Sequence, residues 1–347
     1  MQQASDFMRN NNLTQNTHNL FGNLGMIGQQ DNATLLFFIF LTRFFKNPLH
    51  AIVMWSSGSG KTHLLQGVAG TVPKQHINVT NSRTGDSKQV YLHVEGPVCV
   101  AGATTRDKIY EDNANRSFLI QIEENPVHER EVMQYQGKVA AGLVNFRKYE
   151  ENINLLKACQ LLIEPMEVVI PFAQKLKLPQ HVFKKMRTMN HYLTLVKAVT
   201  LWNQKQRKIT TDQEGNRYLS ATLEDVQWAN YLCKDALLRK SDELGGKTRH
   251  FFESLKDLQT ETQKGNPVFY AKDIRKYFRL HPMQLRRFLD ELEARGFIKC
   301  KSRHMKIGNE YEITTWDDYR QLKGSIDALD SVLLKLREDA VKDVKML

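Results

Sequence analysis

The chain has 347 residues, a length typical of two or three domains. Apolar residues make up 41% and charged residues 25% of it, which excludes a wholly disordered protein. The 49 Lys and Arg residues outnumber the 38 Asp and Glu residues, so the formal net charge is +11 at pH 7. This excess favours a polyanionic partner, and nucleic acid before a membrane surface.

The positive charge is concentrated in one segment near the C-terminal end. Residues 1–125 hold 10 basic and 9 acidic side chains, whereas residues 266–316 hold 11 and 6. We therefore expect residues 266–316 to contact phosphate groups.

Neither the cysteines nor the apolar segments indicate a secreted or membrane protein. The four cysteines form no Cys-x-x-Cys pair, which gives no sign of a zinc knuckle or a disulfide framework. The apolar run at 35–45 includes Arg43 and is too short to cross a bilayer. The N-terminus lacks the features of a signal peptide. We expect a cytoplasmic protein without a membrane partner.

The first two segments of the chain are a polar lead-in and an α/β region. Residues 1–30 are rich in Asn and Gln and are expected to form the lead-in. Residues 31–127 begin with a buried helix at 35–45 and continue with short apolar segments typical of strands. The strands that we expect are 50–54, 77–80, 90–94, 98–103 and 118–122, the second and third of which form a hairpin.

The rest of the chain is mostly helical. Apolar residues recur at three- and four-residue spacing through residues 128–264, which predicts a helical lid. The helices expected there are 128–141, 149–163, 181–202 and 223–239. Residues 317–347 are expected to form a helix packed on the body of the protein, rather than a coiled coil, because fewer than three heptads rarely suffice alone.

Residues 56–63 are the strongest local signal in the sequence. Glycines let backbone N–H groups curl around an oxyanion, a lysine reaches the β- and γ-phosphates, and a hydroxyl binds Mg²⁺. The residues that we expect to bind the cofactor are Ser57, Gly58, Ser59, Gly60, Lys61, Thr62 and His63, with Thr62 as the metal ligand. The segment therefore predicts ATP and Mg²⁺ as cofactors, and its alternative interpretation is a flexible Gly/Ser loop.

One position departs from the full phosphate-binding pattern. The pattern places a glycine six residues before the lysine, and Trp55 stands there. We expect this ring to crowd the loop or to force unusual backbone angles, and so to weaken nucleotide binding.

Together with residues 94–105 and 109–118, the loop resembles one family, the ATPase (helicase-like) region of primase–helicase replication proteins of bacterial mobile elements. The resemblance covers most of residues 20–320. It implies a shortened α/β P-loop NTPase core of the AAA-like type, a helical lid and a C-terminal winged helix-turn-helix. The zinc finger and toprim-type primase of longer members are not in this sequence, so the resemblance does not imply primer synthesis.

The resemblance also implies roles for individual residues. Lys61 and Thr62 correspond to the catalytic phosphate and Mg²⁺ contacts, and Thr104 or Thr105 to the polar sensor of the γ-phosphate. Arg116 is similar to an arginine finger that reaches the nucleotide of a neighbouring subunit, so the resemblance implies a homo-oligomer. The alternative for Arg116 is an ion pair with a nearby acidic residue, Glu111 or Asp112.

The acidic pair that an ATPase uses to hold Mg²⁺ and orient water has no obvious place in this sequence. The family has it between the loop helix and the sensor strand, where residues 71–96 contain no such pair. Glu123 and Glu124 follow an apolar strand and are one substitute; Glu95 is a weaker one. We therefore expect a protein that binds nucleotide but hydrolyses it poorly.

Residues 265–316 have the pattern of a winged helix-turn-helix. Helices are expected at 271–277 and 283–295 and wing strands at 297–299 and 311–313. An apolar stripe on the second helix is expected to be buried: Leu285, Phe288, Leu289 and Leu292. The residues expected to contact DNA are Gln284, Arg286, Arg287, Lys301, Arg303 and Lys306. The alternative is a domain that docks on another protein.

The sequence as a whole predicts an ATP-binding, DNA-binding protein of DNA replication, with a primase or another replisome protein as a further partner. The alternative is a non-enzymatic winged-helix adaptor or regulator that keeps a relic P-loop. The sequence leaves open whether the chain is an enzyme, because a helicase-type ATPase needs the acidic strand that it lacks.

Overall fold

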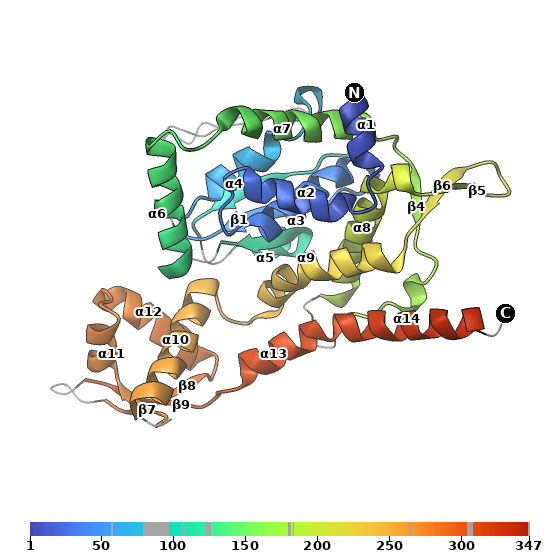
Figure 1. Ribbon diagram of the computed structural model, residues 1–347. Coiled ribbons are helices and arrows are strands. Elements are labelled where there is room, and N and C mark those ends of the chain that lie inside the picture. The colour runs from blue at the N-terminus through green and yellow to red at the C-terminus, as the bar shows by residue number, and fades with distance from the viewer. Residues whose placement is uncertain are drawn as a thin grey trace. The chain divides into compact units, whose positions relative to one another are not determined.

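The computed structural model describes residues 1–56, 58–78, 97–106, 109–122, 126–179, 182, 184–263, 266–303 and 308–345. The chain is mixed α/β, with a small parallel sheet, as the sequence predicts (Figure 1). It falls into two compact units, which are described separately: unit 1 comprises residues 1–240 and 327–347, and unit 2 comprises residues 241–326.

The N-terminal 30 residues of unit 1 are folded, and the expectation of a polar lead-in is corrected. They form α1 (Gln2–Met8) and α2 (Leu13–Asn23), which are followed by α3 (Gln30–Leu41). The Asn and Gln residues that gave this segment its polar composition alternate with fully buried side chains such as Phe21. The indole N–H of Trp202 donates to the Thr17 hydroxyl at 3.0 Å, and its ring lies 4.9 Å from that of Phe37.

Three parallel strands form the central sheet of unit 1, in the order β2-β1-β3. They are β1 (His50–Met54), β2 (Ala101–Thr104) and β3 (Ser117–Gln121), and α3 and α4 (Lys61–Ala69) pack against β1. These strands confirm three of the five that the sequence predicts, and the expected hairpin falls largely on residues 79–96, outside the described part. Because all three strands are parallel, their carboxyl ends lie at one edge of the sheet.

The helical region that follows agrees with the four predicted helices within a few residues. Its helices are α6 (Pro126–Ala140), α7 (Phe146–Leu161), α8 (Lys185–Trp202) and α9 (Leu223–Ser241). A short helix that was not predicted, α5 (Glu111–Arg116), lies between β2 and β3. A second sheet was not expected: β4 (Glu167–Val169), β5 (Ile209–Thr211) and β6 (Arg217–Ser220), in the order β4-β6-β5. These strands have only three or four residues, too few for a recognisable alternation of polar and apolar side chains.

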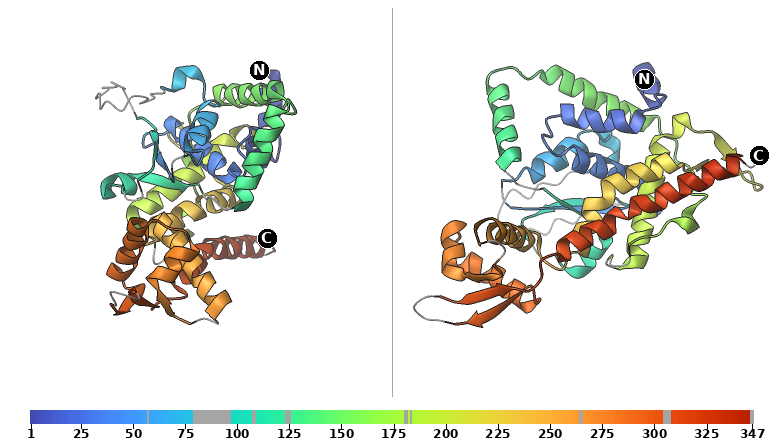
Figure 2. Two further views of the ribbon diagram at one scale, coloured as in Figure 1. Left: turned by 90° about the vertical axis from the view of Figure 1, so that its left-hand side faces the viewer. Right: turned by 60° about the horizontal axis from the view of Figure 1, so that its bottom comes forward.

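The C-terminal residues pack on unit 1, as expected. After α13 (Asp318–Asp327), α14 (Leu329–Lys345) runs along α9 (Figures 1 and 2). Leu329, Leu333 and Leu336 are buried, and Lys234 of α9 pairs with Asp330 at 2.6 Å. Within the described residues, no helix combines the length and the apolar character that crossing a membrane requires.

Unit 2 contains a helix–turn–helix followed by two antiparallel strands. Its elements are α10 (Gly246–Gln263), β7 (Val268–Tyr270), α11 (Ala271–Tyr277), α12 (Pro282–Ala294), β8 (Ile298–Ser302) and β9 (Glu310–Ile313). The strands pair in the order β7-β9-β8. Two helices and two strands lie where the sequence predicts them. The bounds of α11 agree with the prediction, and those of the other three elements differ by at most three residues.

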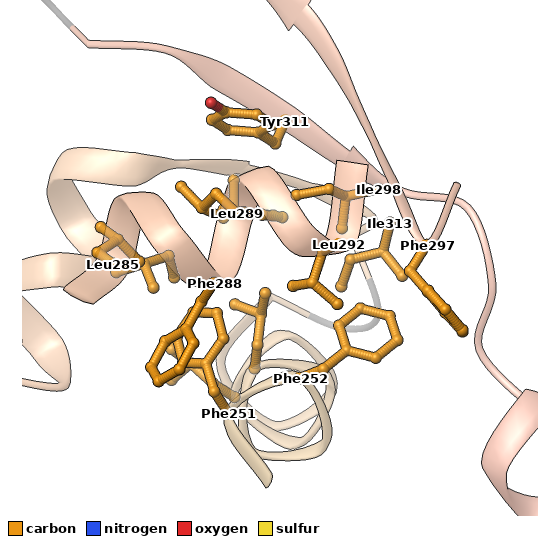
Figure 3. Close-up of a cluster of buried hydrophobic side chains, with 14 of the residues drawn as sticks. Phe251, Phe252, Leu285, Phe288, Leu289, Leu292, Phe297, Ile298, Tyr311 and Ile313 are labelled. Atoms are coloured by element: carbon orange, nitrogen blue, oxygen red, sulfur yellow. The ribbon is translucent and has the colours of Figure 1, made fainter. Parts of the chain in front are cut away.

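The core of unit 2 explains why this unit begins earlier than the predicted boundary at residue 265. Phe251 and Phe252 of α10 pack against α12 and against Phe297, which immediately precedes β8 (Figure 3). The ring of Phe251 stacks on that of Phe288 at 4.9 Å, and Phe252 lies 5.5 Å from Phe297. The predicted apolar stripe of α12 is buried in the same core: Leu285, Phe288, Leu289 and Leu292. Helix α10 is therefore part of this unit rather than of a separate lid.

Candidate functional sites

The loop between β1 and α4 has backbone angles that require glycine at two positions. Gly58 has φ +88° and Gly60 has φ +87°, and a side chain at either position would be strained. Apart from the two chain neighbours of each glycine, no atom of the described residues lies within 4 Å of where their Cβ atoms would be, so this face of the loop is open. Ser57 lies outside the described residues. The sequence analysis expected these glycines to let backbone N–H groups face a ligand. Both glycines are exposed, so backbone is accessible at both positions.

Lys61 begins α4 and turns back across the loop. Its side chain is only 8% exposed, and its ammonium donates to the carbonyl of Ser56 and to the Ser59 hydroxyl, the latter at 3.3 Å. Thr62 and His63 are exposed on the first turn of the helix. The ammonium thus lies over the loop opening, at the end of the helix where the macrodipole is positive.

Trp55 does not distort the backbone, contrary to expectation. Among the described non-glycine residues, only Lys184 and Arg279 have a positive φ. The Trp55 N–H donates to the carbonyl of Thr104 at 3.4 Å, which extends the pairing of β1 with β2. Trp55 therefore has no positive φ, and its backbone does not require glycine.

Thr104 lies at the same edge of the sheet as the loop. It pairs in register with Met54, the last residue of β1, and Gln121 of β3 pairs with Met54 from the other side. The Thr104 hydroxyl accepts the backbone N–H of Arg106 at 3.1 Å. The tertiary structure thus places the predicted sensor position beside the loop.

Arg116 lies at the opposite edge. It precedes Ser117, which pairs with His50, the first residue of β1. Five-residue strands rise about 3.3 Å per residue, which separates the two edges by about 13 Å. The Arg116 guanidinium forms an ion pair with Asp112 at 2.9 Å, the alternative that the sequence left open. Arg116 is thus paired with Asp112 at the edge of the sheet opposite the loop.

The candidate catalytic carboxylates lie outside the described residues: Glu95, Glu123 and Glu124. At the carboxyl ends of the three strands, the described residues 54–56, 104–106 and 121–122 carry no carboxylate. Thr62 fits a role as a metal ligand, because its hydroxyl is exposed beside the loop lysine. Within the described part of the chain, no three His, Cys, Asp or Glu side chains gather into a metal-binding cluster.

A cavity of about 430 Å³ beside the end of β3 was not expected from the sequence. Its walls come from β3, from the start of α3, and from α6 and α9. The amide nitrogen of Gln121 in this wall is buried and has no hydrogen-bond partner among the described residues. Gly25, three residues before the cavity residue Gly28, contacts the helix that follows the loop. The imidazole of His63 in that helix lies 3.3 Å from the carbonyl of Gly25. Four segments far apart in the sequence build the cavity, so no local pattern reveals it.

In unit 2, α12 presents a polar face opposite its buried stripe. Its N-cap is His281, Pro282 occupies the first turn, and Gln284, Arg286 and Arg287 are all exposed. Arg286 is 82% exposed and lies 3.7 Å from Asp290, an exposed ion pair that costs little to break. The three predicted α12 residues therefore share one accessible face.

The hairpin of unit 2 carries two further predicted contacts. Lys301 is exposed on β8 and pairs with Glu312 at 3.3 Å, and Arg303 is exposed just beyond the strand. Lys306 lies outside the described residues. The described part of the hairpin thus presents two cations near its tip.

Comparison with models of known protein families gives no match. Comparison with curated proteins also finds no match.

Proposed function

We propose that the chain binds ATP at residues 56–63 and DNA through unit 2, as a DNA replication protein related to primase-associated helicases. The observation that supports it best is the loop itself: two glycines with left-handed backbone, then a lysine at the start of a helix, at the carboxyl edge of a parallel sheet. Open α/β sheets bind ligands outside the carboxyl ends of their strands, and helix N-termini bind phosphate.

Lys61 and the loop amides would hold the phosphates of the nucleotide. The Lys61 ammonium would exchange its contacts with the Ser56 carbonyl and Ser59 hydroxyl for phosphate oxygens. Mg²⁺, when bound by Thr62, supplies charge neutralisation on the β- and γ-phosphates. The cavity of about 430 Å³ beside β3 is large enough for a nucleobase, and Gln121 offers it an unsatisfied amide.

Nucleotide binding is tested with Lys61→Ala. A hydrogen bond from a charged donor contributes about 1.5–3 kcal/mol, so ATP affinity should fall about 10- to 150-fold. The matched control is Lys74→Ala, which removes an exposed lysine outside the loop. ATP binding by calorimetry that is equal in wild type and Lys61→Ala would refute the proposal.

DNA binding by unit 2 is supported by the exposed cationic face of α12 and by the charge excess of residues 266–316. Replacing both Arg286 and Arg287 by alanine should weaken duplex binding and reduce the salt slope by about 0.9 for each phosphate that the variant no longer neutralises. Arg320→Ala, which changes an exposed arginine on another helix of unit 2, is the control. An unchanged affinity in the double variant would favour a protein-docking role for this face.

Impaired hydrolysis is part of the proposal because residues 71–96, where the family carries its acidic pair, contain no such pair. This observation also favours the second candidate function, a DNA-binding adaptor in which nucleotide acts as a switch or is a relic. Steady-state ATP turnover with and without single-stranded DNA separates the two. Turnover at a rate ordinary for helicases that Glu123→Gln or Glu124→Gln abolishes would exclude the adaptor.

A further inference from the structure

A second cavity of unit 1, of about 560 Å³, is lined by polar and aromatic side chains. Its walls come from residues 11–18, residues 203–207 and the first turns of α9, three segments far apart in the sequence. Half of the lining residues carry amides: Asn11, Asn12, Gln15, Asn203, Gln206 and Gln227. Because no described residue of the lining is aliphatic, the cavity suits a polar ligand better than an apolar one.

Several polar groups in this wall have hydrogen-bonding capacity to spare. The side chains of Asn11 and Asn12 are exposed and bond to no described residue. Gln206 uses only its N–H, which donates to the Met8 carbonyl at 3.2 Å. The Nε of Arg207 is buried without a hydrogen-bond partner among the described residues, and a carbonyl oxygen would satisfy it. A peptide unit has one N–H and one C=O, so an amide side chain can both accept from it and donate to it.

Aromatic rings form another part of the wall. Trp228 and Tyr231, three residues apart on one face of α9, are perpendicular, with their centroids 5.8 Å apart. The His18 ring lies 6.0 Å from that of Trp228. Tyr231 is 51% exposed, and its hydroxyl is fixed by donation to Asp31 at 2.8 Å. Such rings can pack on the aliphatic stem of a lysine or arginine and attract its charged end.

Glu224 gives the lining an unbalanced negative charge. The two basic side chains of the lining already face carboxylates: Arg207 donates to buried Asp225 at 2.8 Å, and His18 lies 3.5 Å from Asp31. Glu224 is exposed and pairs with no described residue. A cationic group on the ligand would therefore be attracted here, whereas a neutral sugar would leave this carboxylate without a partner.

We propose that the cavity binds an extended segment of a partner protein that carries a lysine or arginine side chain. The amides of Asn11, Asn12 and Gln206 pair with the backbone of this segment. Its basic side chain packs on Trp228 and pairs with Glu224. The whole lining belongs to unit 1 and none of it to the nucleotide loop, so this site is separate from the two sites of the proposed function.

The first test compares two peptides on the full chain at low salt. The probes are N-acetyl-Ala-Ala-Lys-Ala-Ala-amide and the same peptide with glutamate in place of lysine, titrated by NMR. The wild type should bind the lysine peptide about three- to 30-fold more tightly, because only that peptide gains the ion pair and the contact of its cation with the rings. In Glu224→Lys this preference should disappear or reverse. Glu150→Lys, which changes an exposed carboxylate on α7, is the matched control and should keep the wild-type preference.

The second test separates backbone pairing from charge. Asn11→Ala/Asn12→Ala should bind both peptides about fivefold more weakly or worse, because it removes side-chain hydrogen bonds that do not depend on the peptide's charge. The ratio of the two affinities should stay as in wild type. Both side chains are exposed and bond to no described residue, so the fold should be retained.

Three outcomes would overturn the proposal. They are failure of the wild type to bind the lysine peptide, equal affinity for the two peptides, and a preference that survives unchanged in Glu224→Lys. Binding of maltose without binding of either peptide falls under the first, and would assign the cavity to a sugar. Lys61→Ala should bind the lysine peptide as the wild type does, so failure of ATP binding and failure of this proposal are distinguishable.

Discussion

Single residues in this chain show how environment, rather than residue type, decides a role. Arg116 and Lys61 are both basic residues beside the same sheet, but they lie at opposite edges, and Lys61 is buried over a glycine loop while Arg116 is exposed. Trp55 stands at a motif position where glycine is usual and keeps ordinary backbone angles. Motif position alone therefore did not determine what this residue does to the loop.

Gly60 gives a residue-scale prediction for the loop. A side chain in left-handed backbone costs about 1–2 kcal/mol, so Gly60→Ala should either destabilise unit 1 by that amount or shift the loop and weaken ATP binding. Gly137→Ala, in α6, has no positive φ and an open Cβ direction, and is the matched control. Chemical denaturation and ATP titration of both variants measure the two effects. A Gly60→Ala variant with the stability and affinity of wild type would contradict the assigned backbone.

His191 gives a prediction for pH. Its pKa is lowered to about 4 in the folded protein, below the ordinary value of 6.5, so the unfolded chain binds a proton more readily than the folded one. The stability that this group contributes is complete above about pH 6.5 and is lost as pH falls towards 4. His191→Gln should therefore reduce the loss of unfolding free energy between pH 7 and pH 5 by about 1 kcal/mol, after allowance for solvent screening. Urea denaturation at the two pH values measures it, and an equal loss in wild type and His191→Gln would contradict the prediction.

At the scale of elements, a buried polar network joins α8 and α9. Asp225 is fully buried and accepts hydrogen bonds from Arg207 at 2.8 Å and from Asn203 at 3.1 Å. Thr200 of α8 donates to the same carboxylate at 3.2 Å. Periodicity predicted both helices, but it did not indicate that a charged residue at the start of α9 would face the core.

This network makes Asp225→Ala a sharp test of element packing. Removing one partner of a buried ion pair leaves the other charge uncompensated and costs about 3–5 kcal/mol. Glu224→Ala, one residue earlier on the exposed face, should change the free energy of unfolding by less than about 0.5 kcal/mol. Equal stability in the two variants would show that Asp225 is not buried as described.

At the scale of the whole molecule, the two units have separate cores and separate candidate sites. Unit 2 contains its own cluster of buried aromatic and aliphatic side chains, together with Arg249, which is 3% exposed and pairs with Asp242 and Asp318 at 2.7 Å. All of these residues lie within 241–326. The unit therefore has the contacts that an independent domain needs.

We expect a fragment of residues 241–326 to fold alone and to bind duplex DNA with a salt slope that Arg286→Ala/Arg287→Ala reduces. A cooperative thermal transition and anisotropy titrations of the fragment measure this. Lys61→Ala in the full chain should leave duplex binding unchanged, because the loop belongs to unit 1. A fragment that stays unfolded would show that its core is incomplete without unit 1.

The sequence by itself determined the local features. These features each lie within a short stretch of sequence, so propensity and spacing reveal them. They are the helical periodicity, the glycines and lysine of the loop, and the apolar stripe of α12. The mixed α/β class, the long helices and the helices and strands of residues 271–313 could be predicted for this reason. The three- and four-residue strands β4, β5 and β6 could not, because they are too short to show a period.

Only the tertiary structure decided how distant segments meet. It folded the Asn- and Gln-rich N-terminus onto α8, placed Thr104 beside the loop and Arg116 at the far edge, and brought α10 into the core of unit 2. It also built the cavity beside β3 from residues up to about 200 positions apart. Strand order and long-range packing determine these contacts. The physical reason is that burying apolar surface is favourable whatever the separation of the two surfaces along the chain.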